Sequence, residues 1–183
     1  SSPEESIKQC VDRYSLDYWA NIDKHIEVWV EKDALVDVVR KAANQYQIDF
    51  FSTRGYCSAT EVWSAHQRFD RYIELGYTPH IIHLSDHDPS GVNMTKDLTI
   101  RFRSVFQTQV RIHRVALTMA QVKNFKPPPN PVKQSDPRCP DYEERYGEAS
   151  WELDALSPDV IVEIIDRKIN KLITDRDRTE IEA

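Results

Sequence analysis

The sequence predicts an α/β protein whose central, mainly parallel sheet of about four strands is flanked by helices. Short β-branched or apolar runs alternate with longer segments that carry apolar residues at helical spacing. Strands that alternate with helices in this way pair in parallel through right-handed crossovers. Three of the predicted strands end in a charged or glycine-containing turn. In open sheets of this kind, sites form at the carboxyl ends of the strands.

Length and composition indicate one intracellular domain. The 183 residues suffice for a single domain with a proper core, and 30% charged and 40% hydrophobic residues are an ordinary globular mixture. No apolar run approaches the roughly 18 residues of a membrane span, and no signal-peptide pattern is present. We therefore expect a cytoplasmic protein without membrane contact. Cys10, Cys57 and Cys139 lie far apart without metal-type spacing, which predicts unpaired thiols in a reducing compartment.

Residues 1–24 are predicted to form a helical lead-in. Ser2 can cap a helix, Pro3 suits its first position, and Glu5 completes a capping box. The expected apolar face consists of Ile7, Val11 and Tyr14. Because the chain begins with Ser1 rather than Met, we expect it to be a fragment of a longer protein.

Residues 25–117 are predicted to form the α/β core. The expected strands are residues 25–30, 48–52, 80–84 and 110–117. The first helix carries its apolar residues at Leu35, Val38, Val39, Ala42 and Tyr46. The second helix covers about 58–75, and a glycine ends it. Its expected inward-facing residues are Val62, Phe69 and Ile73. The third helix runs to about Phe106.

Residues 118–156 are predicted to form a loop-rich excursion, and residues 157–183 a C-terminal helix. Thr118 can cap a short helix, and the prolines of residues 126–133 then exclude regular structure. A further short helix is expected at residues 142–146. Loops of this length in compact domains are often functional. The C-terminal helix carries its apolar residues at Ile161, Ile164, Ile165, Ile169 and Leu172.

Charged residues follow three of the predicted strands. Glu31 comes directly after the first strand, Arg54 and a glycine after the second, and Asp86 and Asp88 after the third. Carboxylates one residue apart just beyond a strand are good ligands for a hard cation such as Mg²⁺. Because parallel strands end at one edge of the sheet, we expect these three segments to meet there.

The charge balance allows two interpretations. The net charge of −6, from 24 basic and 30 acidic residues, argues against an ordinary nucleic-acid-binding protein. Residues 96–138, however, are rich in Lys and Arg, with only Asp97 and Asp136 as acidic residues. A basic face beside an acidic metal site is what a phosphodiester-cleaving enzyme needs. The alternative is a solvated charged surface.

Three motifs in order resemble the Toprim domain of topoisomerases, bacterial primases and OLD-family nucleases. Glu31 lies within Val-Glu-Lys, Gly55 within Arg-Gly-Tyr, and residues 86–91 read Asp-His-Asp-Pro-Ser-Gly. The match is closest to the topoisomerase VI A subunit and the related meiotic double-strand-break transesterase, in which a Glu-x-x-Ala-Leu segment is similar to residues 152–156. The resemblance spans about residues 25–170. It implies a Rossmann-like fold, DNA as the partner, and Mg²⁺ or Mn²⁺ as the cofactor.

One part of that family's machinery has no counterpart in this sequence. The topoisomerase VI A subunit breaks DNA with a Tyr in a winged-helix-like domain ahead of Toprim, and no room for such a domain exists before residue 25. We therefore expect this chain not to perform the covalent step by itself. The Tyr-bearing domain belongs to a parent chain, or the protein hydrolyses DNA, or it only binds.

The resemblance assigns Glu31, Asp86 and Asp88 to metal binding and catalysis, with Glu31 as a possible acid or base toward the leaving oxygen. Their alternative roles are helix capping and interaction with a helix dipole. Without metal, a carboxylate near two others should have a raised pKa. Glu152 and Asp154 are weaker candidates as ligands of a second metal or as partners of the first ligands, and their alternative is a surface turn.

Cations and glycines complete the predicted site. Lys32, Arg54 and Lys96 are candidates for holding phosphate, and the alternative for each is a solvated charge. Gly55 and Gly91 are assigned structural roles, because glycine permits positive φ and close backbone approach.

A zinc site is the rival metal hypothesis. His83, His87 and Asp86 lie close in sequence, and imidazole suits Zn²⁺. The alternative is that His83 is a hydrogen-bonded histidine within its strand and that His87 points away between the two aspartates. Packing in the core is expected for Cys57, Trp29, Trp63 and Trp151, and the alternative for the three tryptophans is stacking on nucleic-acid bases. No glycine-rich nucleotide loop is present, so nucleotide cofactors are not expected.

Three functions are compatible with these observations. The first is a metal-dependent nuclease or DNA-cleaving domain. The second is a metal- and DNA-binding module that is inactive without an upstream Tyr-bearing domain. The third is a non-catalytic interaction domain whose carboxylates only shape the fold. The sequence does not define the oligomeric state.

Overall fold

A four-stranded, all-parallel sheet forms the centre of the protein. The computed structural model describes residues 2–7, 19 and 21–175. The strands are β1 (Lys24–Val30), β2 (Asp49–Ser52), β3 (Thr78–Leu84) and β4 (Arg111–Ala116). Their order is β2-β1-β3-β4, and every neighbouring pair is parallel. The predicted α/β class with a parallel sheet is confirmed, and the arrangement is consistent with a Rossmann-like fold.

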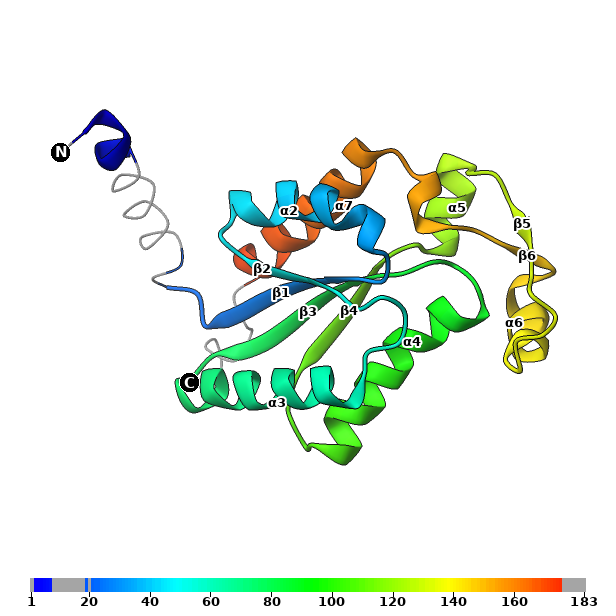
Figure 1. The fold of residues 1–183 in the computed structure, drawn as a ribbon, viewed down its shortest axis with the longest axis horizontal. Coiled ribbons are helices and arrows are strands. Elements are labelled where there is room, and N and C mark those ends of the chain that lie inside the picture. The colour runs from blue at the N-terminus through cyan, green and yellow to red at the C-terminus, as the bar shows by residue number, and fades with distance from the viewer. Residues whose placement is uncertain (1, 8–18, 20, 176–183) are drawn as a thin grey trace.

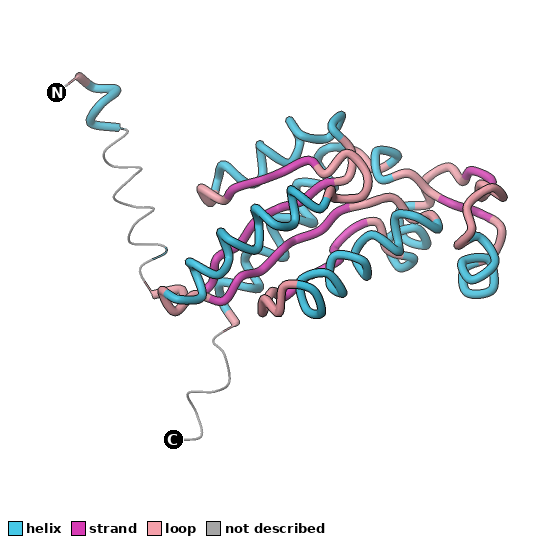
Figure 2. The backbone as a smooth tube through the Cα atoms, turned by 60° about the horizontal axis from the view of Figure 1, so that its bottom comes forward, coloured by secondary structure: helices cyan, strands magenta, loops and turns pink. Residues whose placement is uncertain are grey.

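Helices cover both faces of the sheet (Figures 1 and 2). α2 (Val36–Gln45) and α7 (Pro158–Thr174) lie on one face, and α3 (Ala59–Glu74) and α4 (Pro89–Ile100) lie on the other. A π-helical segment (Arg101–Val105) extends α4. Within the described part of the chain, no helix has the length and apolar character needed to cross a membrane.

The two faces of the sheet bury different residues because side chains alternate along a strand. On the side of α2 and α7, Val28 and Ile82 pack in one cluster with Ile165. On the side of α3 and α4, Ile81 packs in a second cluster with Phe69. All five side chains are fully buried. Close packing on both faces fixes the strands, and therefore their carboxyl ends, relative to one another.

The predicted excursion contains a small core of its own. It comprises α5 (Met119–Phe125), α6 (Cys139–Tyr146) and an antiparallel ribbon of β5 (Asn130–Pro131) and β6 (Ala149–Ser150). The expectation that residues 126–133 lack regular structure is therefore wrong for β5, because an edge strand tolerates proline. The buried residues of this small core are Val132, Cys139 and Tyr142. α6 begins earlier than the predicted residues 142–146, because a proline in its first turn is compatible with a helix start.

The predicted helix starts are confirmed. The side chains of Ser58, Thr118 and Ser157 each accept a hydrogen bond from the backbone N–H three residues later. Ser2 and Glu5 form the predicted capping box. Cys10, Val11 and Tyr14 lie outside the described residues.

Two predicted core placements on α3 are wrong. Ile73 is 37% exposed and Trp63 is 47% exposed. Only a narrow stripe of α3, which includes Val62 and Phe69, faces the sheet. Trp63 instead packs at the surface against the ring of Phe106, with 5.6 Å between centroids. The helical spacing was compatible with a wider buried face than this outer helix has.

Arg114 on β4 is mostly buried and is not part of a basic surface. Its guanidinium donates hydrogen bonds to the carbonyls of Asp86 (2.7 Å), Gly91 (2.9 Å) and Leu117 (3.0 Å), and to the hydroxyl of Ser85. Burial lowers the pKa of Arg114. One side chain thus connects the end of β3, the first turn of α4 and the end of β4.

Gly91 in the first turn of α4 has no room for a side chain. A Cβ atom there would overlap the carbonyl oxygen of Asp86 and lie 3.0 Å from Asp88 Oδ1. Gly55 is structural for a different reason, because its φ is +97° while the space around a Cβ is open.

We expect Gly91→Ala to lower the free energy of unfolding by about 3 kcal/mol, because backbone must move to accept the methyl group. Gly55→Ala is the matched comparison, and its cost should be about 1 kcal/mol, from positive φ alone. Urea denaturation of both variants measures the two values. Equal stability of Gly91→Ala and the wild type would contradict the close approach of α4 to the Asp86 carbonyl.

Candidate acidic site at the carboxyl edge of the sheet

The three predicted segments meet at the carboxyl edge of the sheet, as expected. The backbone N–H of Glu31 donates to the carbonyl of Leu84 at the end of β3 (2.9 Å). The N–H of Thr53 donates to Val30 (2.9 Å), and that of Gly55 donates to Glu31 (3.2 Å). The turns after β1, β2 and β3 are therefore joined by backbone hydrogen bonds.

Glu31 has the most perturbed carboxyl group of this edge. Its Oε2 accepts a hydrogen bond from the backbone N–H of Asp86 (2.9 Å). The pKa of Glu31 is raised to about 7, mainly by burial and also by the negative charges of Asp86 and Asp88, against the opposing effects of that hydrogen bond and of the Lys32 charge. The predicted rise is confirmed, but burial is a larger cause than like charge.

Asp86 is 8% exposed and uses both of its carboxylate oxygens within the protein. Oδ1 accepts a hydrogen bond from the N–H of Leu153 (2.7 Å). Oδ2 lies 3.3 Å from Nζ of Lys32. Burial raises the pKa of Asp86, while the hydrogen bond from Leu153 and the charge of Lys32 oppose the rise.

Asp88 caps α4. Its Oδ1 accepts from the N–H of Gly91 (2.6 Å) and from the hydroxyl of Ser90 (3.3 Å). The capping role considered as an alternative is therefore real. It leaves Oδ2 without a hydrogen bond from the described residues.

Lys32 joins the carboxylates of two distant segments. Its Nζ lies 3.3 Å from Asp86, 3.1 Å from Asp154 and 3.7 Å from Glu152. Although partial burial lowers the pKa of Lys32, the charge of Asp86 and the contacts with Asp154 and Glu152 raise it overall. The structure thus brings the two weaker candidates, Glu152 and Asp154, to the same edge, and Lys32 lies between them and Asp86.

His87 anchors the excursion to this edge. It exchanges two backbone hydrogen bonds with Trp151 (2.8 and 2.9 Å). Its ring Nδ1 lies 2.8 Å from the hydroxyl of Tyr142. Burial lowers the pKa of His87 to about 4. This bridge explains how residues 152–154, far along the chain, reach Asp86.

The other two predicted phosphate-binding cations point elsewhere. Nε of Arg54 forms an exposed ion pair with Asp33 (2.7 Å). Lys96 is exposed on α4, where it lines a pocket of about 120 Å³ together with Arg138 and Arg145 of the excursion. Of the three predicted cations, only Lys32 lies against the carboxylates.

The residue types at this edge fit a hard cation, but the side chains are not assembled around one. Among the described residues, no group of three or more His, Cys, Asp or Glu side chains is arranged to hold a metal ion. Asp86 is occupied by Lys32 and by Leu153. Unused oxygens remain at Glu31 Oε1 and Asp88 Oδ2, which accept no hydrogen bond from the described part of the chain. Carboxylate oxygens are the donors that Mg²⁺ prefers, and the ammonium of Lys32 stands where a cation would meet Asp86.

The zinc alternative gains no support from the positions of its residues. His83 is buried within β3, and its Nδ1 lies 2.7 Å from the hydroxyl of Thr95. His87 faces Tyr142, away from the carboxylates. Cys57 is buried, as predicted, and burial raises the pKa of its thiol to about 12.

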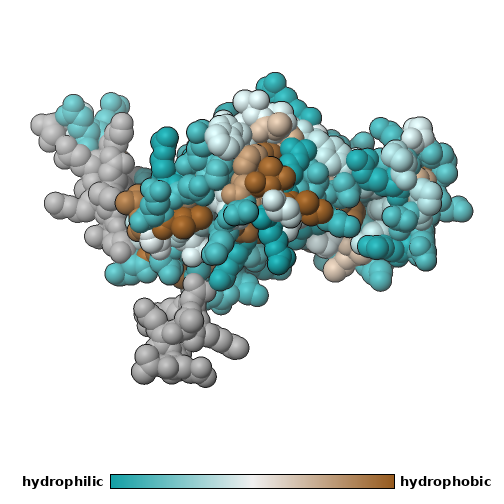
Figure 3. Space-filling view, turned by 90° about the horizontal axis from the view of Figure 1, so that it is seen from below, coloured by the Kyte–Doolittle hydropathy of each residue, from teal (hydrophilic) through white to brown (hydrophobic). Residues whose placement is uncertain are grey.

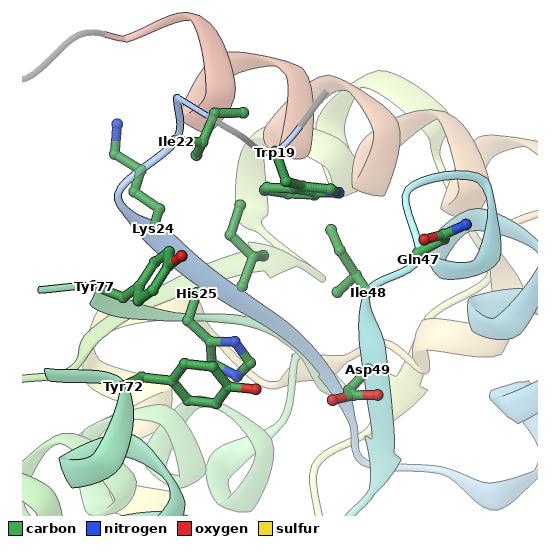
Figure 4. Close-up of a pocket in the computed structure, with 10 residues that line it drawn as sticks. Trp19, Ile22, Lys24, His25, Gln47, Ile48, Asp49, Tyr72 and Tyr77 are labelled. Carbon is green, nitrogen blue, oxygen red and sulfur yellow. The ribbon is translucent and has the colours of Figure 1, made fainter. Parts of the chain in front are cut away.

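A larger pocket, of about 240 Å³, lies at the opposite edge of the sheet (Figure 4). It is lined by residues at the amino ends of the strands, and the rings of His25 and Tyr72 stack there at 3.6 Å. None of the predicted site residues lines it. It lies away from Glu31, Asp86 and Asp88 and is therefore separate from the candidate site.

No protein-family model matches this chain, and no curated protein matches it. The fold and the candidate site therefore define its class: an α/β protein with a four-stranded parallel sheet and a cluster of acidic residues at the carboxyl edge of that sheet.

Sequence reasoning missed the buried contacts of Arg114 and the position of Arg145 in the lining of the pocket between α4 and α6. Arg114 supports the Asp86 turn from a strand, and no local pattern distinguishes a buried arginine from an exposed one. Arg145 could have been found, because it lies seven residues after Arg138 and therefore on the same face of α6.

We expect Glu31→Gln to become more stable relative to the wild type as pH rises. The folded pKa of about 7 lies above the unfolded value of 4.5, so the protonated carboxyl stabilises the wild type fully below pH 4.5, and this contribution is lost as pH rises through 7. The difference in unfolding free energy should change by about 3 kcal/mol in favour of the variant. Urea denaturation of both proteins in EDTA from pH 4.5 to 8.5 measures it.

The comparison between the two proteins also controls for histidine titration. Burial lowers the pKa of His80 and His83 to about 3, so both proteins lose stability in acid. This effect cancels in the difference. A difference that does not change with pH would contradict the raised pKa of Glu31.

Proposed function

We propose that the protein is a metal-dependent DNA-cleaving domain of the Toprim type. The observation that carries the proposal is the carboxyl group of Glu31, whose pKa is about 7 and which lies beside Asp86 and Asp88 at the carboxyl edge of a parallel sheet. A group that exchanges protons near neutral pH, next to further carboxylates, is typical of catalytic sites. The order of the three motifs that resemble Toprim supports the same assignment.

Glu31 is suited to donate a proton to the leaving oxygen of a phosphodiester. Near pH 7 about half of the Glu31 carboxyl groups carry a proton, and Oε1 is not used by a hydrogen bond within the described chain. In hydrolysis, water adds to phosphorus, the bond to the leaving oxygen breaks, and that oxygen takes the proton of Glu31. The proton of the water passes to solvent.

Asp86 and Asp88 would hold a Mg²⁺ or Mn²⁺ ion, and Glu31, as the proton donor, would stand beside the ion rather than ligate it in its ionised form. The bound ion would stabilise charge on a phosphoryl oxygen and orient the attacking group. Arg114 and Leu153 keep the Asp86 turn and its carboxylate in place. Lys32 must move away from Asp86 when a cation binds, and Glu152 and Asp154 remain as its partners.

A non-catalytic domain is the second candidate, and Lys32 is the observation that favours it. Its ammonium already neutralises Asp86 without any metal. In that case the acidic edge is a structural ion-pair cluster that joins the excursion to the sheet. A module that binds DNA and needs an upstream Tyr-bearing domain for cleavage is a variant of the first candidate.

We expect Mg²⁺- or Mn²⁺-dependent nicking of supercoiled plasmid, which falls at least roughly 100-fold in Glu31→Gln and in Asp86→Asn. Both substitutions keep the size of the side chain, and the amide oxygen that replaces Oδ1 in Asp86→Asn can still accept from Leu153. The matched controls are Glu163→Gln on α7 and Asp37→Asn on α2, both exposed, which should cleave like the wild type. Cleavage that persists in EDTA or in both site variants would overturn the proposal.

The Lys32→Gln variant distinguishes the metal-dependent catalytic domain from the non-catalytic domain by its affinity for Mn²⁺. If a cation competes with the ammonium for Asp86, the variant should bind Mn²⁺ roughly fivefold to tenfold more tightly than the wild type. Isothermal titration calorimetry without DNA measures this affinity. Absence of Mn²⁺ binding to both proteins, together with a loss of stability in the variant, would favour the non-catalytic candidate.

A further inference from the structure

A basic pocket lies beside the acidic edge, between α4 and α6. Its volume is about 120 Å³. α4 contributes Asn93 and Lys96, and α6 with its preceding residue contributes Arg138, Tyr142 and Arg145. On each helix the lining residues follow at three- and four-residue spacing, so each helix presents one face to the pocket. Figure 3 shows that the end of the molecule that carries α6 is mostly hydrophilic.

The charges around this pocket are unbalanced. Its lining holds Lys96, Arg138 and Arg145 but only one carboxylate, that of Asp141. Within the described chain, Arg138 forms an ion pair with Asp136 (3.3 Å), and no ion pair involves Lys96 or Arg145. The whole protein has a net charge of −6, so this is a local concentration of positive charge. A small pocket with such charges attracts anions.

The fold holds Arg138 and Asn93 in place. The guanidinium of Arg138 lies 5.0 Å from the ring centre of Tyr56. The hydroxyl of Tyr56 donates to the carbonyl of Ser90 (3.3 Å) and accepts from Nδ2 of Asn93 (2.9 Å). α6 itself is tied to the Asp86 turn by the contact between Tyr142 and His87. Pre-positioned arginines are well matched to phosphate oxygens because their donors form a planar fork.

The pocket is formed by residues that directly follow the acidic edge along the chain. Tyr56 directly follows the Gly55 turn at the end of β2, and α4 begins at its cap, Asp88. Pro89, the first residue of α4, lines the pocket as well. The carboxylates of the edge repel phosphate, so a polyanion that reaches them must be held by cations nearby.

We infer that the pocket between α4 and α6 binds backbone phosphates of a nucleic acid and holds the strand against the acidic edge. Lys96 and Arg145 supply the charge, and Arg138 and Asn93 the fixed donors. The inference rests on the proposed function only for the choice of a nucleic acid as the ligand, and binding at this pocket needs no metal.

The test is DNA binding in EDTA, measured by fluorescence anisotropy of a labelled oligonucleotide duplex over a range of salt concentrations. The double variant Lys96→Gln/Arg145→Gln should bind at least roughly tenfold more weakly, and the slope of log affinity against log salt should fall by about 2. The charge-preserving variant Lys96→Arg/Arg145→Lys should keep most of the affinity. The matched control is Lys41→Gln/Arg71→Gln, exposed on α2 and α3, which should bind like the wild type.

Equal affinity and equal salt slope of the Lys96→Gln/Arg145→Gln variant and the wild type would overturn the inference. Absence of DNA binding by the wild type, with binding of inorganic phosphate in calorimetry, would also overturn it in favour of a small phosphate ligand. The outcomes are separate from those of the cleavage experiment. If the variant loses DNA binding and the wild type does not cleave DNA, the pocket is established and the catalytic proposal is rejected. If the wild type cleaves DNA and the variant binds DNA like the wild type, the catalytic proposal stands and the pocket is rejected.

Discussion

The guanidinium of Arg114 satisfies backbone carbonyls from separate segments that meet at the carboxyl edge of the sheet. Arg114 is the side-chain donor to the carbonyl oxygens of Asp86 and Leu117, and it shares the carbonyl of Gly91 with the hydroxyl of Ser85. A buried carbonyl left without a donor costs about 1–3 kcal/mol. Gly91 adds a steric condition, because only a glycine lets α4 start this close to Asp86. Together these two residues determine the direction of the Asp86 turn, and with it the positions of the Asp86 and Asp88 carboxylates.

Two neighbouring regions of opposite charge lie here, the carboxylates at the edge of the sheet and the basic pocket between α4 and α6. At the edge of the sheet, burial raises the pKa of Glu31 to a value near neutral pH, and Lys32 neutralises Asp86. In the basic pocket, cations outnumber carboxylates. Under the proposed function, a polyanion and a divalent cation bind next to each other here, because the carboxylates attract the cation and the basic pocket attracts the phosphates. The excursion contributes to both regions. Its residues 152–154 reach Lys32 at the edge of the sheet, and α6 lines the basic pocket.

Most of the fold could be predicted because its signals are local. Strand runs, helical spacing and capping residues such as Ser58 and Thr118 act over a few residues, and the structure confirms them. Predictions about the environment of single side chains were less successful. Ile73 and Trp63 fit a helical apolar pattern, but the outer helix α3 buries only a narrow stripe. Arg114 counted as a surface charge because its partners are backbone atoms, which a sequence does not distinguish.

The sequence by itself determined the parallel α/β sheet and the edge at which Glu31, Asp86 and Asp88 gather, because strand ends in such sheets share one side. Only the tertiary structure decided what each carboxylate contacts. The pairing of Lys32 with Asp86 and Asp154, and of His87 with Trp151, joins segments that are distant along the chain. Such contacts depend on how the excursion folds back onto the sheet, and that path is fixed by packing and buried hydrogen bonds rather than by any local pattern.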